Sequence, residues 1–287
     1  MREEVQGSEK AKNIVEKIKE LSAKPAVFIT RKQGVRPGLT DSKLGGLPYW
    51  DMDREFPVDS NGEKMMLLAQ INFSDLKDFD VELPKEGLLQ FFIRTDDDLY
   101  GADFDEPAAQ KDFRVIYHDV LRTDVTEEQI AETGMKRAEE EGEYSPVFSE
   151  EALAFRLGTD YINPNVAGFE KIFADAVKAV TGEDIGEKAS SYEYFDDDDN
   201  DFLYEELSGE GHKILGYPTF TQSDPREYME PEKAERYDTV LLQIDTDMED
   251  GEDYVLWGDC GVANLFMSAD ALKRRDFSDV LYNWDCC

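Results

Sequence analysis

The sequence predicts an α+β fold, made of internally duplicated β-rich units whose antiparallel sheets are covered by helices. Three observations lead to this class. Short, continuous apolar runs of strand length occur at residues 65–73 and 87–94. Apolar residues recur at helical spacing in residues 8–23 and 164–180. Blocks of similar sequence also occur in the same order in the two parts of the chain.

The first part of the chain predicts one helix followed by several strands. Residues 8–23 place Ile14 and Ile18 on one helical face, and the side chain of Ser8 is suited to cap the start of this helix. Apolar runs that are too short for core helices follow. We expect strands at residues 26–30, 65–73, 87–94 and 113–117.

The middle and the second part combine helices with further strands. Residues 126–141 predict an acidic surface helix, because Thr126 and Gln129 have the spacing of a capping box. Residues 164–180 predict a helix whose apolar face packs on the sheet. The remaining strands are expected at residues 152–157, 240–245, 254–258 and 261–267.

The internal repeat consists of three pairs of matched blocks at offsets of 170, 173 and 174 residues. They are KLGGLP (43–48) with KILGYP (213–218), LLAQIN (67–72) with VLLQID (240–245), and GLLQFFI (87–93) with GVANLFM (261–267). This period is too long for a solenoid. We therefore expect one compact domain over residues 1–287. It would contain a first β-rich repeat at 26–120, a helical and acidic connection at 121–210 and a second β-rich repeat at 211–287.

The composition restricts the partners and the location. Sixty-six acidic residues against 31 Lys and Arg give a formal net charge of −35, which repels nucleic acid and anionic membranes and attracts basic proteins. The N-terminus has no apolar signal region, and no apolar run reaches the length of a membrane helix. The cysteines, Cys260, Cys286 and Cys287, form no disulfide framework. We expect a cytoplasmic protein that binds neither nucleic acid nor membranes.

Each Gly-x-Pro block predicts a rigid turn. Gly46 and Gly216 permit a positive φ, while Pro48 and Pro218 hold the preceding residue extended. The alternative is a ligand edge lined by backbone.

Gln70 and Gln243 interrupt two apolar strands at matched positions. A buried amide without partners costs about 1–3 kcal/mol, so each side chain must form hydrogen bonds. They are either structural amides that bind an adjacent turn or two symmetric polar groups in a shared cleft.

A cysteine-dependent enzyme is one reading of the segment WGDCG at residues 257–261. Cys260 lies between glycines, His212 is one of two histidines, and Asp259 is placed to orient it or to cap the turn. Trp257 is the first residue of this segment, and we predict that it is a binding residue. The surrounding negative charge opposes thiolate formation, and a buried structural cysteine is the commoner case.

The acidic residues 193–210 predict a solvated loop rather than a metal site. Asp196, Asp198 and Asn200 have the spacing of a calcium loop, but Asp201 and Leu207 replace the required glycine and glutamate. The chain also lacks zinc spacing, a phosphate-binding loop and a nucleophile elbow. We therefore expect no metal and no cofactor.

Several blocks of the chain resemble a known family. They are KLGGLPYW, LLAQINF, LPKEGLLQFFI, GYPTFTQSDPR, LLQID, WGDCGVANLF and DFSDVLYNWDCC. From about residue 42 to residue 287, they look like the YwqG family, a bacterial family of unknown function. The resemblance implies a duplicated α+β fold and no settled activity. By association it also implies a role in binding another protein or in neutralising a toxin.

The expected function is that of a non-catalytic protein-binding module for a basic partner, such as a basic toxin domain. Electrostatic steering would accelerate the association. The contact points are the acidic helix after Thr126 and the four consecutive acids Asp196, Asp197, Asp198 and Asp199. The alternative is a cysteine-dependent enzyme or a small-molecule-binding protein that uses the cleft between the two repeats.

Overall fold

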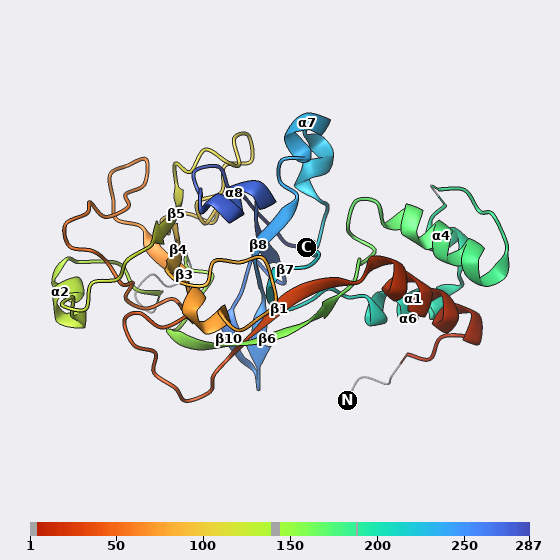
Figure 1. Ribbon diagram of the computed structural model, residues 1–287, viewed down its shortest axis with the longest axis horizontal. Helices are drawn as coiled ribbons and strands as arrows, with labels where there is room; N and C mark the ends of the chain where they lie inside the picture. Colours follow the sequence, from red (N-terminus) through yellow and green to blue (C-terminus); the bar gives the residue numbers. More distant parts are fainter. Residues whose placement is uncertain (1–4, 139–143, 188) are drawn as a thin grey trace.

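The computed structural model describes residues 5–138, 144–187 and 189–287 (Figure 1). Within these residues the main element is a curled ten-stranded antiparallel sheet, and the helices lie around it. The structure is therefore a mixed one, dominated by one antiparallel sheet with added helices, which agrees in part with the predicted α+β class. None of the helices in the described ranges combines the length and the apolar character that crossing a bilayer requires.

The large sheet has the strand order β12-β11-β8-β7-β1-β6-β2-β3-β4-β5. Its strands are β1 (Lys24–Arg31), β2 (Lys43–Leu44), β3 (Met66–Asn72), β4 (Leu88–Ile93), β5 (Phe113–His118), β6 (Glu151–Asp160), β7 (His212–Leu215), β8 (Thr239–Asp245), β11 (Val262–Met267) and β12 (Leu281–Asp285). β9 (Asp247–Glu249) and β10 (Glu252–Val255) form a separate pair. All residues of β4 and β11 are buried, which explains why their sequences are continuously apolar rather than alternating.

The strand order is symmetric about the central β1–β6 pair. If β1, β2, β3, β4 and β5 are exchanged with β6, β7, β8, β11 and β12, respectively, the strand order becomes the original order read in reverse. The matched blocks of sequence lie on exchanged strands, and Lys43 faces Gln70 across β2–β3 as Lys213 faces Gln243 across β7–β8. The two central strands change halves. β1 pairs with β7 of the second half of the sheet, and β6 pairs with β2 of the first half.

One hydrophobic core joins the two halves of the sheet. It contains Leu68 and Phe91 from one half together with Leu242 and Leu265 from the other. The two ends of the sheet also meet, because the ring of Phe113 on β5 packs against Tyr282 on β12 with 5.2 Å between centroids. Each half thus buries the apolar face of the other.

Helices α1 (Glu9–Ser22) and α4 (Phe169–Thr181) do not cover the sheet, contrary to our prediction. α1 starts at the predicted cap, where Ser8 Oγ accepts a hydrogen bond from the Ala11 N–H. Its apolar stripe, with Ile14, packs against Phe173 and Val177 of α4 in a helical lobe beyond the ends of β1 and β6 (Figure 1). The two amphipathic helices bury each other's apolar faces. The apolar face of each half of the sheet is covered by the other half.

The acidic run that we expected as a loop is helical. It forms α5 (Ser191–Tyr194) and α6 (Asp197–Glu206), and Asp196 caps α6 by accepting a hydrogen bond from the Asp199 N–H at 3.0 Å. Carboxylates in the first turn interact favourably with the positive end of the helix dipole, which the loop prediction overlooked.

The remaining helices are short. α2 (Glu127–Glu132) has the predicted capping box of Thr126 and Gln129 but is shorter than the expected helix, part of which lies outside the described residues. The others are η1 (Phe73–Leu76), η3 (Pro225–Tyr228), α7 (Pro231–Ala234) and α8 (Ala269–Arg274).

Candidate functional site

A groove of ≈ 670 Å³ lies beside the end of β12. Its walls come from residues 104–107, from residues 222–230, from Lys233 on α7 and from the end of β12. Segments that are far apart in the sequence therefore form one concave surface.

Three aromatic side chains line this groove and reach solvent. Phe104 is 59% exposed and Tyr228 is 78% exposed, while Trp284 is partly exposed. The Trp284 indole is held in place, because its Nε1–H donates a hydrogen bond of 2.8 Å to the Leu99 carbonyl. Exposed aromatic side chains gathered in a concavity are typical of a binding surface.

The charged groups of the groove are mainly acidic. Asp105 and Glu230 line it, and within the described part of the chain neither carboxylate forms an ion pair. Lys233 is the one basic residue among the described lining residues. The groove therefore combines aromatic faces with carboxylates that are available to a cation.

Hydrogen bonds fix the wall formed by residues 221–228. The Asp285 carboxylate accepts from the main-chain N–H groups of Thr221 (3.3 Å) and Gln222 (2.8 Å), and burial raises the pKa of Asp285. Gln222 Nε2 also donates to the Cys286 carbonyl at 2.6 Å. These contacts tie the wall to β12, so the groove is formed before any ligand arrives.

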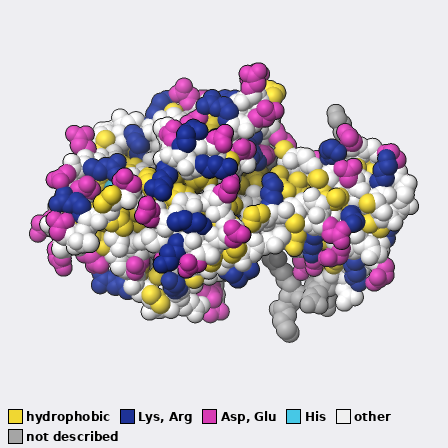
Figure 2. Space-filling view, viewed as in Figure 1, with side chains coloured by type: hydrophobic (Ala, Val, Ile, Leu, Met, Phe, Trp, Pro, Cys, Tyr) yellow, Lys and Arg dark blue, Asp and Glu magenta, His cyan; other side chains and the backbone are white. Residues whose placement is uncertain are grey.

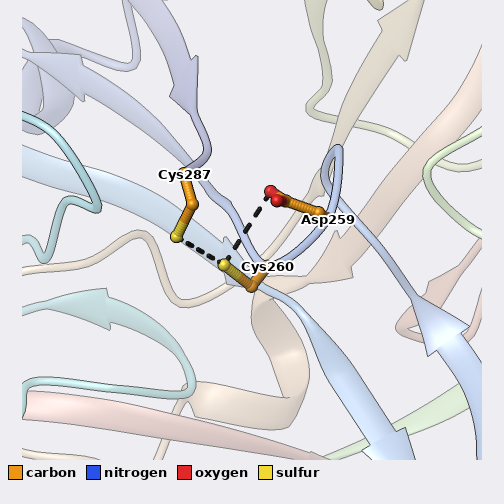
Figure 3. Close-up of side chains that lie close together, drawn as sticks. All are labelled: Asp259, Cys260 and Cys287. Carbon is orange, nitrogen blue, oxygen red and sulfur yellow. Dashed lines mark hydrogen bonds between the residues drawn. The ribbon is translucent and has the colours of Figure 1, made fainter.

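All three cysteines of the chain lie close together beside this groove. Cys286 lines it, and Cys260 Sγ lies 2.7 Å from Cys287 Sγ (Figure 3). The turn at residues 257–261 can approach the tail because it contains glycines: a Cβ on Gly258, whose φ is +60°, would lie 2.6 Å from Cys286 Sγ.

Two of the three thiols, those of Cys286 and Cys287, are poorly suited to act as nucleophiles. The hydrogen bond to Cys260 and desolvation raise the pKa of Cys287 to about 11, and the Asp259 charge adds to this shift. Burial raises the pKa of Cys286. Since the thiolate is the reactive form, these surroundings oppose nucleophilic catalysis.

Cys260 and His212 are the predicted catalytic pair, but in the described part of the chain their side chains contact different residues. His212 is buried on β7, its Nδ1 accepts a hydrogen bond of 2.9 Å from the Asp245 N–H, and its Nε2 lies 3.6 Å from Asp247 Oδ2. The described partners of the Cys260 thiol are Asp259, 3.8 Å away, and Cys287. Among the described residues, the geometry therefore gives the Cys260 thiol no histidine partner.

The side chains of Gln70 and Gln243 form hydrogen bonds with the main chain of the adjacent turn, each in its own half of the sheet. Gln70 Oε1 accepts from the Tyr49 N–H at 3.0 Å, and Gln243 Oε1 accepts from the Thr219 N–H at 2.8 Å. Each amide nitrogen donates to two carbonyls, those of Leu39 and Asp41 in the first half and those of Gly209 and Gly211 in the second. Both side chains are fully buried and have hydrogen-bond partners on both amide atoms.

The Gly-x-Pro blocks lie within these bound turns. Gly46 and Gly216 have φ values of +70° and +73°, as the sequence predicts. Pro48 and Pro218 follow them, and the Pro218 carbonyl accepts a hydrogen bond from Asn163 Nδ2 at 2.7 Å. Gly216 also borders a smaller pocket of ≈ 260 Å³, apart from the groove beside β12.

The other predicted binding residues divide between core and surface. Trp257 is fully buried and packs against Tyr100 with 5.6 Å between ring centroids. Asp199 is buried as well, and its carboxylate accepts hydrogen bonds from the Ser8 N–H and Oγ–H at 2.6 and 2.8 Å. Asp196, Asp197 and Asp198 are exposed.

Most residues of the groove were not singled out from the sequence. A signal is nonetheless present, because an aromatic residue followed closely by Glu-Pro occurs in FDEP at 104–107 and again in YMEP at 228–231. Both segments contribute to the groove.

Two comparisons with known proteins bear on this chain. A family model described as "Domain of unknown function (DUF1963)" matches residues 42–286. A search of the curated proteins found no match.

Proposed function

The chain belongs to this family of unknown function, DUF1963, and we propose that it is a non-catalytic protein-binding module whose groove beside β12 receives a basic segment of its partner. The observation that supports this proposal is the lining of the groove. Exposed aromatic side chains lie there beside carboxylates that pair with no cation of the described residues, in a chain whose net charge is −35.

A lysine or arginine side chain has two kinds of favourable contact in such a groove. Its cation can lie over the faces of Phe104, Tyr228 or Trp284, which contributes about 0.5–2 kcal/mol per contact. The carboxylates of Asp105 and Glu230 can pair with the same cation. The field of the whole chain raises the rate of encounter with a basic protein.

The acidic surface of α5 and α6 is a second contact region for a larger partner. Exposed carboxylates of Glu193, Asp197, Asp198 and Asp201 lie there beside Tyr192, which is 65% exposed. The face drawn in Figure 2 carries basic and acidic side chains side by side, with apolar side chains between them, so the acidic excess is not uniform. A basic toxin domain in the cytoplasm is a partner of the proposed kind.

We also propose that the two halves arose by duplication and that the relationship extends to the YwqG family. The symmetric strand order and the matched hydrogen bonds of Gln70 and Gln243 support the first statement. The proposal does not extend to a cysteine-dependent enzyme or a small-molecule-binding protein. The enzyme is left out because the described partners of the Cys260 thiol are Asp259 and Cys287, with no histidine between them, and because the pKa values of Cys286 and Cys287 are raised.

Replacing Tyr228 by alanine is expected to weaken binding of a deca-arginine peptide about tenfold, since aromatic anchors carry much of the energy of an interface. Binding is measured by the change in tryptophan fluorescence and by calorimetry at low salt. The control is Tyr144→Ala, because Tyr144 is also an exposed tyrosine but does not line the groove. Equal losses in the two variants would exclude the groove as the binding site.

The charge of the groove is tested separately. D105N/E230Q is expected to lower the affinity for deca-arginine and to reduce the dependence of the affinity on salt. D78N/D80N removes the same charge from exposed positions outside the groove. If this control loses as much affinity as D105N/E230Q, the peptide responds only to net charge, and the proposed groove is wrong.

A further inference from the structure

We propose that Asp259, Cys260 and Cys287 form a binding site for one thiophilic metal ion, of which Zn²⁺ is the natural example, next to Cys286 and the groove. This inference is independent of the protein-binding role. It gives a role to the cysteine side chains, which take no part in the proposed protein binding.

The geometry of the three side chains suits a single ion. One ligand atom from each residue lies within 4.8 Å of the other two (Figure 3). Zinc binds sulfur at about 2.3 Å and carboxylate oxygen at about 2.0–2.2 Å, so one ion is within reach of all three groups. In a tetrahedral site the two sulfurs are about 3.8 Å apart, which requires Cys260 and Cys287 to separate by about 1 Å from their present 2.7 Å.

The exposed positions of the ligands permit this small movement. Asp259, Cys260 and Cys287 are all exposed, and they lie on a turn and on the tail after β12 rather than in the core. Three protein ligands leave one tetrahedral position open to solvent, as in zinc sites that also bind an exogenous ligand.

The fold holds the two ligand segments side by side. β11 pairs with β12 so that Val262 faces Asp285, which places Cys260 and Cys287 next to each other across the end of the ladder. Hydrogen bonds fix the turn, because the Gly261 N–H donates to the Trp257 carbonyl at 2.7 Å and Thr246 Oγ1 donates to the Gly261 carbonyl at 2.8 Å. The site is therefore largely formed without the metal.

The donor set selects the class of metal. Two thiolates with one carboxylate favour Zn²⁺, Cd²⁺ or Co²⁺ over Mg²⁺ and Ca²⁺, which prefer oxygen ligands. Cys286 does not belong to the group of three ligand atoms, and its sulfur lies against Gly258. It therefore provides an internal comparison.

The test uses the full chain with its thiols reduced by a phosphine. Excess Mg²⁺ occupies the many surface carboxylates, and Cd²⁺ or Co²⁺ is then added while thiolate-to-metal charge-transfer absorption is recorded. We expect a band that saturates at one ion per chain and, for Co²⁺, is abolished by Zn²⁺.

Matched variants identify the ligands. C260S and C287S should each lower the affinity at least about tenfold, a loss that is usual even for an outer-shell partner. D259N should weaken binding, while the controls C286S and D250N should retain the band and its stoichiometry. Thermal unfolding of each variant without metal checks that the fold is intact.

Three results would overturn the proposal. They are the absence of a charge-transfer band, an equal loss in C286S and C260S, and a reduced protein that binds no Cd²⁺ although its oxidised form contains a Cys260–Cys287 disulfide. A disulfide without Cd²⁺ binding would indicate that Cys260 and Cys287 act as a redox pair rather than as metal ligands. The readout is the metal alone, so failure of the deca-arginine experiment leaves it unaffected.

Discussion

Asp160→Asn is expected to lower the free energy of unfolding by about 3–5 kcal/mol, the usual cost of removing one partner of a buried ion pair. Asp160 Oδ2 accepts hydrogen bonds from Lys213 Nζ at 2.9 Å and from the Tyr217 N–H at 2.8 Å. The Lys213 side chain is fully buried, and desolvation lowers its pKa. Asparagine keeps the shape of the side chain but removes the carboxylate that pairs with the ammonium group. Among the described residues, only the charge of Asp245 remains near it, so folding must bury a poorly compensated charge or deprotonate the lysine.

The other half of the sheet provides the control. Lys43 occupies the position that matches Lys213, and its Nζ lies 2.9 Å from Glu150 Oε1. The Glu150 side chain is 19% exposed whereas that of Asp160 is 9% exposed, so water compensates more of the loss in Glu150→Gln. Urea unfolding followed by tryptophan fluorescence should show a smaller loss for E150Q than for D160N.

A double variant separates the charge from the packing. D160N/K213M removes both charges, and we expect it to regain most of the stability that D160N loses, since an apolar pair can replace a buried ion pair at little cost. A double variant as unstable as D160N would contradict this account, as would a loss in D160N no larger than that in E150Q.

The sequence predicts those parts of the fold that depend on local patterns. β3 and β4 are continuous apolar runs because both of their faces are covered, and the caps at Ser8 and Thr126 involve atoms only three residues apart. β12 was missed, because polar residues such as Asn283 interrupt its apolar side chains and its pairing with β11 is a long-range contact. Helical periodicity shows that a face is buried but not which surface covers it, so the placement of α1 and α4 was wrong.

The candidate site could be predicted even less completely. The groove brings together Phe104, Tyr228 and Trp284, and only the curling of the sheet makes these distant segments neighbours. The approach of Cys260 to Cys287 likewise depends on the register of β11 and β12. In the run of four aspartates, only tertiary structure distinguishes Asp199, which binds Ser8, from its exposed neighbours.

His118 should make the protein lose stability as the pH falls from about 6.5 to about 4. The ring is buried on β5, with Nδ1 3.2 Å from Arg54 Nη1 and Nε2 2.9 Å from Gln90 Oε1. A guanidinium group only donates, so Nδ1 accepts and the Nε2–H donates to Gln90. The histidine is therefore neutral. Burial, followed by the charge of Arg54, lowers its pKa to about 4.

The sign of the effect follows from proton linkage. In the unfolded chain His118 takes up a proton near its ordinary pKa of about 6.5, whereas the folded protein takes it up only near pH 4. Between these values the unfolded state binds more protons, so the free energy of unfolding decreases as the pH falls. The contribution is fully present above pH 6.5. About 3 kcal/mol of it is lost by pH 4, since one pKa unit corresponds to about 1.4 kcal/mol.

Many carboxylates titrate in the same range, so the effect must be measured as a difference between proteins. The free energy of unfolding of the wild type and of His118→Gln is determined in urea at several pH values from 4 to 7, and the difference should change by about 3 kcal/mol over that interval. Arg54→Gln keeps the histidine but removes the neighbouring charge, so its His118 pKa should rise and its pH dependence should be weaker than that of the wild type. Parallel pH profiles for the wild type and His118→Gln would show that His118 has the same pKa in the folded and unfolded chains, and the neutral, hydrogen-bonded ring described above would then be wrong.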